Sequence, residues 1–243
     1  MKAMIFAAGL GTRLRPLTND RPKALVEING KPLLEIAIRR LKYFGFQEII
    51  INIHHFGELI LDFLKKNNDF GITIEISDER DLLLETGGGL KKATSFFDDG
   101  MPFLVCNADI LTNLNLKELY DFHLKNNPLA TLAVRNRKTS RYLLFNEKNK
   151  ELVGWENQKT GEVRWSKPSK EIVHWAFSGI HVIDPKIFEL MPNQTIFSII
   201  EVYLSAAKEH SILGFLHDNN IWLDVGKPES LAKAQHIIDK INL

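Results

Sequence analysis

The first half of the chain alternates between strand-like and helix-like patterns of apolar positions. Ala3–Ala8 is a continuous apolar run followed by a glycine, as expected of a strand that is buried on both faces. Pro32–Phe44 then carries apolar residues at helical spacing, and Gly45 stands where a C-terminal cap belongs. Glu48–Ile53 returns to a β-branched pattern. This alternation predicts an α/β fold in which helices connect successive strands.

The same alternation continues as far as residue 135. The further strands that it predicts are Ile72–Ile76, Phe103–Cys106 and Ala130–Val134, and the further helices are Glu58–Leu64, Leu90–Phe97 and Leu116–Leu124. Strands and helices at this spacing predict a Rossmann-like, doubly wound sheet that is mostly parallel and covered on both faces. The crossovers between parallel strands are expected to be right-handed.

Beyond residue 135 the pattern becomes that of a hairpin. Its predicted strands are Tyr142–Phe145 and Glu151–Trp155, and the polar stretch Asn146–Lys150 is its turn. Near the end of the chain, Pro228–Ile241 has the pattern of a closing helix. We therefore expect a single domain over residues 1–243, with a small β-rich insertion near residues 140–180.

Composition and charge exclude several classes of protein. Hydrophobic residues make up 44% and charged residues 25% of the 243 residues, as in an ordinary globular domain. The net charge of +1 argues against a nucleic-acid partner bound through a broad basic face. The single cysteine, Cys106, excludes an intrachain disulfide and a cysteine metal cluster. No apolar run approaches 18 residues, so we expect a cytoplasmic protein without a membrane partner.

The segment after the first strand has the features of a phosphate-binding loop. Ligands of open α/β sheets bind beyond the carboxyl ends of the strands. Gly9 and Gly11 would let the backbone approach a phosphate closely, and successive N–H groups of such a turn form an anion-binding concavity. Arg13, Arg15 and Lys23 add positive charge nearby. The plain alternative is a basic surface turn.

Two familiar loops of this kind can be tested on the sequence. A dinucleotide-binding loop requires G-x-G-x-x-G or A, and Leu14 occupies the third fixed position. The P-loop pattern G-x-x-x-x-G-K-[ST] does not occur. The loop is therefore expected to hold phosphate in another way, and a nicotinamide-dependent oxidoreductase is disfavoured.

Two aspartates follow apolar stretches far apart in the sequence. Asp109 follows the strand Phe103–Cys106, and Asp224 lies in Trp222-Leu223-Asp224-Val225-Gly226. If both carboxylates lie at the mouth of the sheet, they repel each other unless a cation joins them. Mg²⁺ is suited to this role because it takes few protein carboxylates and fills its shell with phosphate oxygens and water. The plain alternative for each aspartate is a helix or turn cap.

The fixed letters from Gly9 to Lys23 resemble a known signature. G-x-G-T-R-x-x-P-x-T followed by P-K resembles the signature of the sugar nucleotidyltransferase (nucleotide-diphospho-sugar pyrophosphorylase) family. An aspartate after a strand and a second one in a W-x-D-x-G context belong to the same resemblance, which covers nearly the whole chain. Ala108 stands before Asp109 where many relatives have glycine. The resemblance implies that Asp109 and Asp224 bind Mg²⁺.

The resemblance also implies a nucleotide-binding half of about residues 1–135 and a sugar-binding half of about residues 136–243. The residues expected to act in catalysis are Arg13, Lys23 and Asp109. Those expected to bind the nucleotide are Ala8, Gly9, Gly11, Thr12, Arg13, Lys23, Glu85, Gly88, Gly89 and Asn107. Those expected to bind the sugar are Glu156, Asn157, Ser178 and Gly179.

The segments implied for the base and the sugar carry less specific signals. Three glycines in Leu84–Leu90 are expected to form a loop that exposes backbone groups to the nucleobase, with a flexible helix cap as the alternative. The usual E-K-P of the sugar site is missing, and Lys167-Pro168 occurs later. Trp155, Trp165 and Trp175 could stack on a sugar, although core packing is the preferred interpretation.

The implied activity joins a nucleoside triphosphate to a sugar 1-phosphate and releases pyrophosphate. The resemblance is closest to short bacterial uridylyltransferases that act on N-acetylmuramate 1-phosphate, in nucleotide-sugar synthesis for the cell envelope. GTP-dependent mannose- or heptose-1-phosphate guanylyltransferases remain an alternative, and so does a sugar-nucleotide sensor without chemistry. The expected partners are these small molecules, and the expected state is a monomer or a small homo-oligomer.

Overall fold

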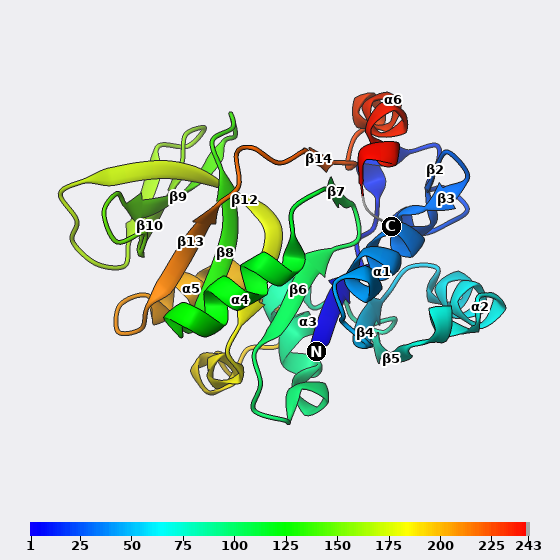
Figure 1. The fold of residues 1–243 in the computed structure, drawn as a ribbon, viewed down its shortest axis with the longest axis horizontal. Coiled ribbons are helices and arrows are strands. Elements are labelled where there is room, and N and C mark those ends of the chain that lie inside the picture. Colours follow the sequence, from blue (N-terminus) through cyan, green and yellow to red (C-terminus); the bar gives the residue numbers. More distant parts are fainter. Residues whose placement is uncertain (242–243) are drawn as a thin grey trace. The chain divides into compact units, whose positions relative to one another are not determined.

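The computed structural model describes residues 1–241, which form two compact units (Figure 1). The first unit contains residues 1–84, 105–117 and the segment from Asn220 onward. The second contains residues 85–104 and 118–219. The two units interleave along the sequence, and both the single domain and its division into halves near residue 135 stay predictions.

The first unit is built on a sheet with the strand order β6-β1-β4-β5. Its strands are β1 (Lys2–Phe6), β4 (Glu48–Ile53), β5 (Thr73–Asp78) and the end of β6 (Phe103–Asn107). Strands β1, β4 and β5 are parallel, and Met4, Ile50 and Glu75 lie side by side in them. β1 and β4 are apolar and almost wholly buried, as the sequence pattern predicts.

Helices α1 (Leu33–Tyr43), α2 (Gly57–Lys66) and α6 (Pro228–Ile237) belong to the same unit. Gly45 ends α1 with a positive φ of 87°. Its N–H donates to the Lys42 carbonyl at 3.0 Å, and the N–H of Phe46 donates to Leu41 at 3.0 Å, which is a Schellman cap. The expected closing helix is shorter than predicted, because a 3₁₀ turn (Ile238–Lys240) follows α6.

Two short antiparallel ladders complete the unit. β2 (Glu27–Ile28) pairs with β3 (Lys31–Pro32), and β7 (Ile110–Thr112) pairs with β14 (Trp222–Asp224). A buried apolar cluster joins them to α1 and α6; it consists of Leu14, Val26, Ile28, Leu33, Ile36, Leu111, Val225, Ala234, Ile238 and Ile241. Leu14 anchors the glycine loop in this cluster.

The second unit holds a mixed sheet with the order β11-β10-β9-β12-β8-β13. Its strands are β8 (Ala130–Arg135), β9 (Arg141–Asn146), β10 (Leu152–Asn157), β11 (Glu162–Trp165), β12 (Ile172–Ile183) and β13 (Ile212–Leu216). β9 and β10 are antiparallel, which confirms the predicted hairpin, and β13 runs parallel to β8. Helix α5 (Ile199–Ala206) belongs to the same unit, and so does α4 (Leu116–Asn126) apart from its first two residues.

The prediction of a helix over residues 90–97 is wrong at both ends. Helix α3 is Glu85–Lys92, and Thr94–Phe97 is a separate 3₁₀ turn. The glycines expected to form a loop therefore lie inside the first turns of α3. The free N–H groups at the start of this helix are capped by a carbonyl far along the chain. Phe197 O accepts from Gly87 N at 2.8 Å and from Gly88 N at 3.2 Å.

None of the helices in residues 1–241 combines the length and the apolar character that a membrane crossing requires.

Candidate functional site

The fixed positions of the glycine loop contact one another. Gly11 has a left-handed φ of 65° and precedes the 3₁₀ turn Thr12–Leu14. Thr18 Oγ1 donates to the Gly11 carbonyl at 2.9 Å. A Cβ at Gly11 would lie 3.0 Å from Thr18 Cγ2 and 3.1 Å from Lys23 Cβ. Glycine is thus required here both by the backbone conformation and by the close packing of Thr18 and Lys23.

Lys23 starts a 3₁₀ turn after Pro22, and its ammonium forms an ion pair with Asp109 Oδ2. The two side chains are only 13% and 21% exposed. Asp109 follows β6 by two residues, and its backbone carbonyl accepts from Val225 N at 2.9 Å. The end of one strand and the segment after β14 therefore hold this carboxylate beside a cation that is distant in sequence.

Arg13 and Asp224 meet beside Gly226. A Cβ at Gly226 would lie 2.6 Å from Asp224 Oδ1 and 2.7 Å from Nη2 of Arg13. Asp224 is the last residue of β14 and pairs with Ile110 in the ladder with β7. Its Oδ1 is buried and has no hydrogen-bond partner among the described residues. The first unit thus brings together Arg13, Lys23, Asp109 and Asp224, four of the charged residues that the sequence singled out, with Gly11 at the base of Lys23.

The metal prediction can be compared with these donors. Residues 1–241 hold no group of three or more His, Cys, Asp or Glu side chains with the arrangement of a metal site. A magnesium site of two carboxylates, completed by ligand phosphates and water, would not need one. The buried Oδ1 of Asp224 is an orphaned anionic oxygen of the kind that a cation satisfies. The donor set fits Mg²⁺, whose binding stays a prediction.

The remaining residues expected at the phosphates differ in exposure. Ala8 is buried, Gly9 and Thr12 are exposed, and Asn107 is half-buried at the end of β6. A Cβ at Gly9 would meet nothing within 4 Å. Nothing in the protein itself therefore requires glycine at position 9.

The segment expected at the nucleobase is more deeply buried than the sequence suggested, and part of its backbone is already hydrogen-bonded. Gly88 and Gly89 are buried in α3, and Gly88 N–H is taken by Phe197 O. A Cβ at Gly87 would lie 2.4 Å from the Phe197 ring, so that glycine serves packing. Glu85 is exposed at the start of the helix. The expectation of an open glycine loop is wrong, whereas base binding by this segment stays a prediction.

Ser178 and Gly179, expected at the sugar, lie in an irregular part of β12. The pairing of β12 with β8 shifts register between Phe177 and His181, and Gly179 has a φ of 73°. Ser178 is fully buried, and its Oγ is 2.7 Å from Nε2 of His217. The Ser178 hydroxyl therefore already has a partner inside the second unit.

Glu156 and Asn157 end strand β10. The carboxylate of Glu156 lies 3.0 Å from Nε2 of His174 and is 23% exposed. Asn157 Oδ1 accepts from Lys159 N at 3.1 Å, so this side chain forms the turn between β10 and β11. Both side chains are half-buried.

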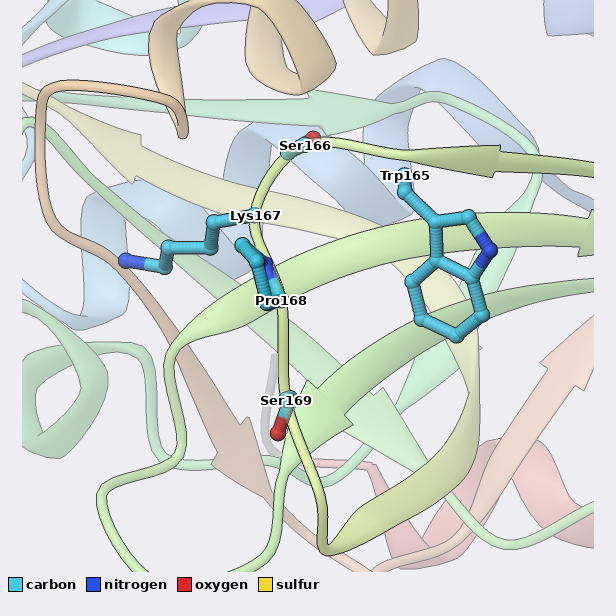
Figure 2. A pocket seen from close by; sticks show the side chains of 5 residues that line it. All are labelled: Trp165, Ser166, Lys167, Pro168 and Ser169. Atoms are coloured by element: carbon cyan, nitrogen blue, oxygen red, sulfur yellow. The ribbon is translucent and has the colours of Figure 1, made fainter.

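Two of the three tryptophans, Trp165 and Trp175, have different surroundings. Trp175 is 4% exposed and packs against Phe145, as the preferred interpretation expects. Trp165 is 54% exposed, so core packing is wrong for this residue. Trp165 and the segment Ser166–Ser169 line a pocket of about 430 Å³, and their side chains are drawn in Figure 2. Lys167 points away from Trp165 there and pairs with Glu151 Oε2 at 2.7 Å.

The structure adds two residues that the sequence analysis did not single out. Thr18 supports Gly11, and Gly226 makes room for Arg13 and Asp224. Both belong to the matched patterns, as the last T of the loop signature and the final G of W-x-D-x-G. Their fixed places in these two motifs could have indicated a role from the sequence alone. The contacts in the structure show what each residue does.

Comparison with known proteins gives matches over almost the whole chain. Residues 2–240 match the nucleotidyl transferase family. An N-acetylmuramate alpha-1-phosphate uridylyltransferase from Caulobacter vibrioides is 33% identical, over 96% of this chain and 95% of the relative. A mannose-1-phosphate guanyltransferase from Yarrowia lipolytica is 31% identical over 96% of this chain, but the match covers only 63% of that relative.

A solved structure has a similar fold. HddC from Yersinia pseudotuberculosis, complexed with GMP-PN, has a TM-score of 0.75 and 23% identity over 98% of this chain and 99% of that one. The family match, the relatives and the fold agree. The chain therefore belongs to the nucleotidyl transferase family and is a sugar-1-phosphate nucleotidyltransferase.

Proposed function

We propose that the protein transfers a uridylyl group from UTP to N-acetylmuramate 1-phosphate or a related hexose 1-phosphate and releases pyrophosphate. The observation that carries this choice is the match to the Caulobacter uridylyltransferase, which spans 95% of that relative at 33% identity. The guanyltransferase from Yarrowia has a similar identity, but the match covers only 63% of its length.

The chemistry requires little from acid–base groups. The phosphate oxygen of a sugar 1-phosphate is already anionic at neutral pH, so it can attack the α-phosphorus without a general base. Catalysis then rests on positioning and on stabilising the charge of the transition state. Attack is in line with the departing pyrophosphate, as in other phosphoryl-type transfers.

The charged residues of the first unit supply these needs in our proposal. Gly11, Thr12 and Arg13 hold the triphosphate, and the Arg13 guanidinium stabilises the pyrophosphate as it departs. Lys23, whose ammonium is directed by Asp109, bridges the two reacting phosphates. Asp109 and Asp224 would hold Mg²⁺, which when bound supplies positive charge at the α-phosphate.

The remaining residues bind the two substrates. Ala8, Gly9 and Asn107 lie along the nucleotide, and Glu85, Gly88 and Gly89 face the base. Glu156, Asn157, Ser178 and Gly179 contact the sugar. Glu156 accepts hydrogen bonds from sugar hydroxyls, since its carboxylate is partly exposed beside His174.

A second candidate is a guanylyl transfer from GTP to mannose or heptose 1-phosphate. It is supported by the 31% identity to the Yarrowia guanyltransferase over 96% of this chain. No residue described above distinguishes uracil from guanine, so the two candidates differ in substrate and share one site.

A substrate matrix tests the proposal. Pyrophosphate release is measured with Mg²⁺ for UTP, GTP, CTP, dTTP and ATP, each crossed with the 1-phosphates of N-acetylmuramate, N-acetylglucosamine, glucose, mannose and heptose. We expect the highest kcat/KM for UTP with N-acetylmuramate 1-phosphate. A preference for GTP with mannose or heptose 1-phosphate would replace the first candidate by the second.

A further inference from the structure

A buried carboxyl group lies in the first unit, outside the residues discussed so far. Glu79 follows β5 directly and is 1% exposed. Its Oε1 accepts from Asn52 Nδ2 at 2.8 Å, and its Oε2 accepts from the backbone N–H of Leu84 at 3.2 Å. Both oxygens are thus used by neutral donors, which makes the position of this side chain specific.

Asn52 continues the connection on its other side. It lies on β4, is 3% exposed, and its Oδ1 accepts from the backbone N–H of Ala7 at 2.7 Å. A backbone N–H can only donate, so Asn52 must direct its carbonyl to Ala7 and its amino group to Glu79. The orientation of the amide is fixed, and a relay runs from Ala7 through Asn52 and Glu79 to Leu84.

The relay is held in place by two further contacts. The N–H of Glu79 donates to the Ile53 carbonyl at 2.8 Å. The Glu79 carbonyl lies 2.6 Å from Nδ1 of His54. Neither Asn52 nor Glu79 can therefore shift without breaking several hydrogen bonds.

The two ends of the relay adjoin the two segments that are proposed to bind the nucleotide. Ala7 directly precedes Ala8 and Gly9 at the start of the phosphate loop, and Leu84 directly precedes Glu85 at the start of α3. We propose that Asn52 and Glu79 are positioning residues that fix the starts of both nucleotide-binding segments. The inference rests on the proposed function, because that proposal assigns these segments to the nucleotide.

Exchanging donors and acceptors tests the relay. Glu79→Gln keeps the shape but replaces one of two acceptor oxygens by a donor, so either Asn52 or Leu84 loses its bond. Asn52→Asp sets two carboxyl groups against each other. The double variant N52D/E79Q restores every bond with the direction of the middle one reversed. The new carboxylate at position 52 accepts from the Ala7 N–H and from the new amide at position 79, whose carbonyl oxygen accepts from the Leu84 N–H.

The measured quantities separate positioning from general stability. The dissociation constant of UTP with Mg²⁺, and of GTP likewise, is measured by calorimetry without a sugar phosphate, so that no turnover is needed. KM for the sugar 1-phosphate and the unfolding midpoint are measured beside it. Thr131→Val is the matched control, since it removes the buried hydrogen bond of 3.0 Å to His123 in the second unit. Asn52→Ser replaces any single variant that does not fold.

We expect each single variant to weaken nucleotide binding on the order of tenfold, with KM for the sugar 1-phosphate unchanged. The double variant should bind within about twofold of wild type, and Thr131→Val should lower only the unfolding midpoint. Folded single variants with unchanged nucleotide affinity, or a folded double variant that is not rescued, would overturn the relay. A wild-type protein that binds nucleotide but transfers nothing would overturn the proposed function and leave the relay test valid.

Discussion

The ammonium of Lys23 and the carboxylate of Asp109 form an ion pair although 86 positions separate them in the sequence. Both side chains are mostly shielded from water. Charges in such surroundings attract each other more strongly than they do in bulk solvent. The cation proposed to bridge the reacting phosphates is thus held by a carboxylate proposed to bind the metal. The pair links the glycine loop to the end of β6.

Breaking this pair from either side should remove activity and leave the fold intact. We expect Lys23→Ala and Asp109→Asn each to lower kcat by about a hundredfold or more, since a charge contact to a transition state contributes about 3 kcal/mol. Pyrophosphate release measures the rate, and circular dichroism measures the fold. Lys148→Ala, which breaks an exposed pair with Glu171, is the control. Near-normal turnover in both variants contradicts the account.

Gly226→Ala should act through its neighbours. The added methyl group would overlap Asp224 Oδ1 and the Arg13 guanidinium, so at least one of them must move. We expect a loss of kcat/KM of at least about tenfold, with the larger effect on steps that involve pyrophosphate. The reverse reaction, from nucleotide-sugar and pyrophosphate, measures this directly. An unchanged KM for pyrophosphate would argue against a role for Arg13 there.

Gly9→Ala tests whether glycine is required at this position for nucleotide binding or for the stability of the fold. A Cβ at Gly9 has open space, so the unfolding midpoint should stay the same or rise slightly, as alanine restricts the unfolded chain. Triphosphate binding should weaken if a phosphate lies against this backbone. Gly11→Ala, strained by its φ of 65°, should lose both stability and binding. Unchanged nucleotide affinity in Gly9→Ala would remove this residue from the site.

The metal prediction concerns Asp224. We expect Mg²⁺ to raise the unfolding temperature of the wild type in the presence of UTP, since a ligand of the folded state stabilises it. Asp224→Asn should lose this increase together with turnover, and a chelator should abolish the turnover of the wild type. Without metal the variant should be no less stable, because Oδ1 has no partner to lose among the described residues. Full activity in a chelator would contradict a metal at this position.

Three buried histidines of the second unit should make stability depend on pH. Burial lowers the pKa of His123 to about 4, of His181 to about 3 and of His217 to about 4. The unfolded value is about 6.5, so the unfolded chain binds more protons between pH 6.5 and these values. Their stabilisation is complete above pH 6.5 and falls as the solution is acidified through this window.

Urea unfolding at pH 7.5, 6 and 5 measures this dependence. We expect the midpoint to fall with pH and to fall less in His123→Asn, whose side chain does not titrate. An equal fall in the wild type and the variant would assign the effect to other groups.

The sequence predicts best where local signals suffice. Gly45 and Glu48–Ile53 appear as expected because a left-handed cap and an apolar, β-branched strand are encoded within a few residues. Helix α3 begins five residues earlier than expected because the carbonyl of Phe197 caps it, a contact that no local pattern contains. The glycines before residue 90 therefore had the pattern of a loop while the fold makes them helical.

The candidate site follows the same rule. Arg13, Lys23, Asp109 and Asp224 stand in recognisable motifs, so the sequence could name them. Their arrangement depends on the β7–β14 ladder and on the absence of a side chain at Gly226, which are tertiary features. The hydrogen bonds of Asn52 and Glu79 are also tertiary features, and no motif in the sequence marks either residue.

We infer that the chain makes a nucleotide-sugar at the charged residues of its first unit. The most direct measurement follows both products of UTP and N-acetylmuramate 1-phosphate with Mg²⁺, in the wild type and in Lys23→Ala. We expect nucleotide-sugar and pyrophosphate in equal amounts from the wild type, and a rate lower by about a hundredfold from the variant. Pyrophosphate without nucleotide-sugar, or equal rates in the two proteins, would contradict it.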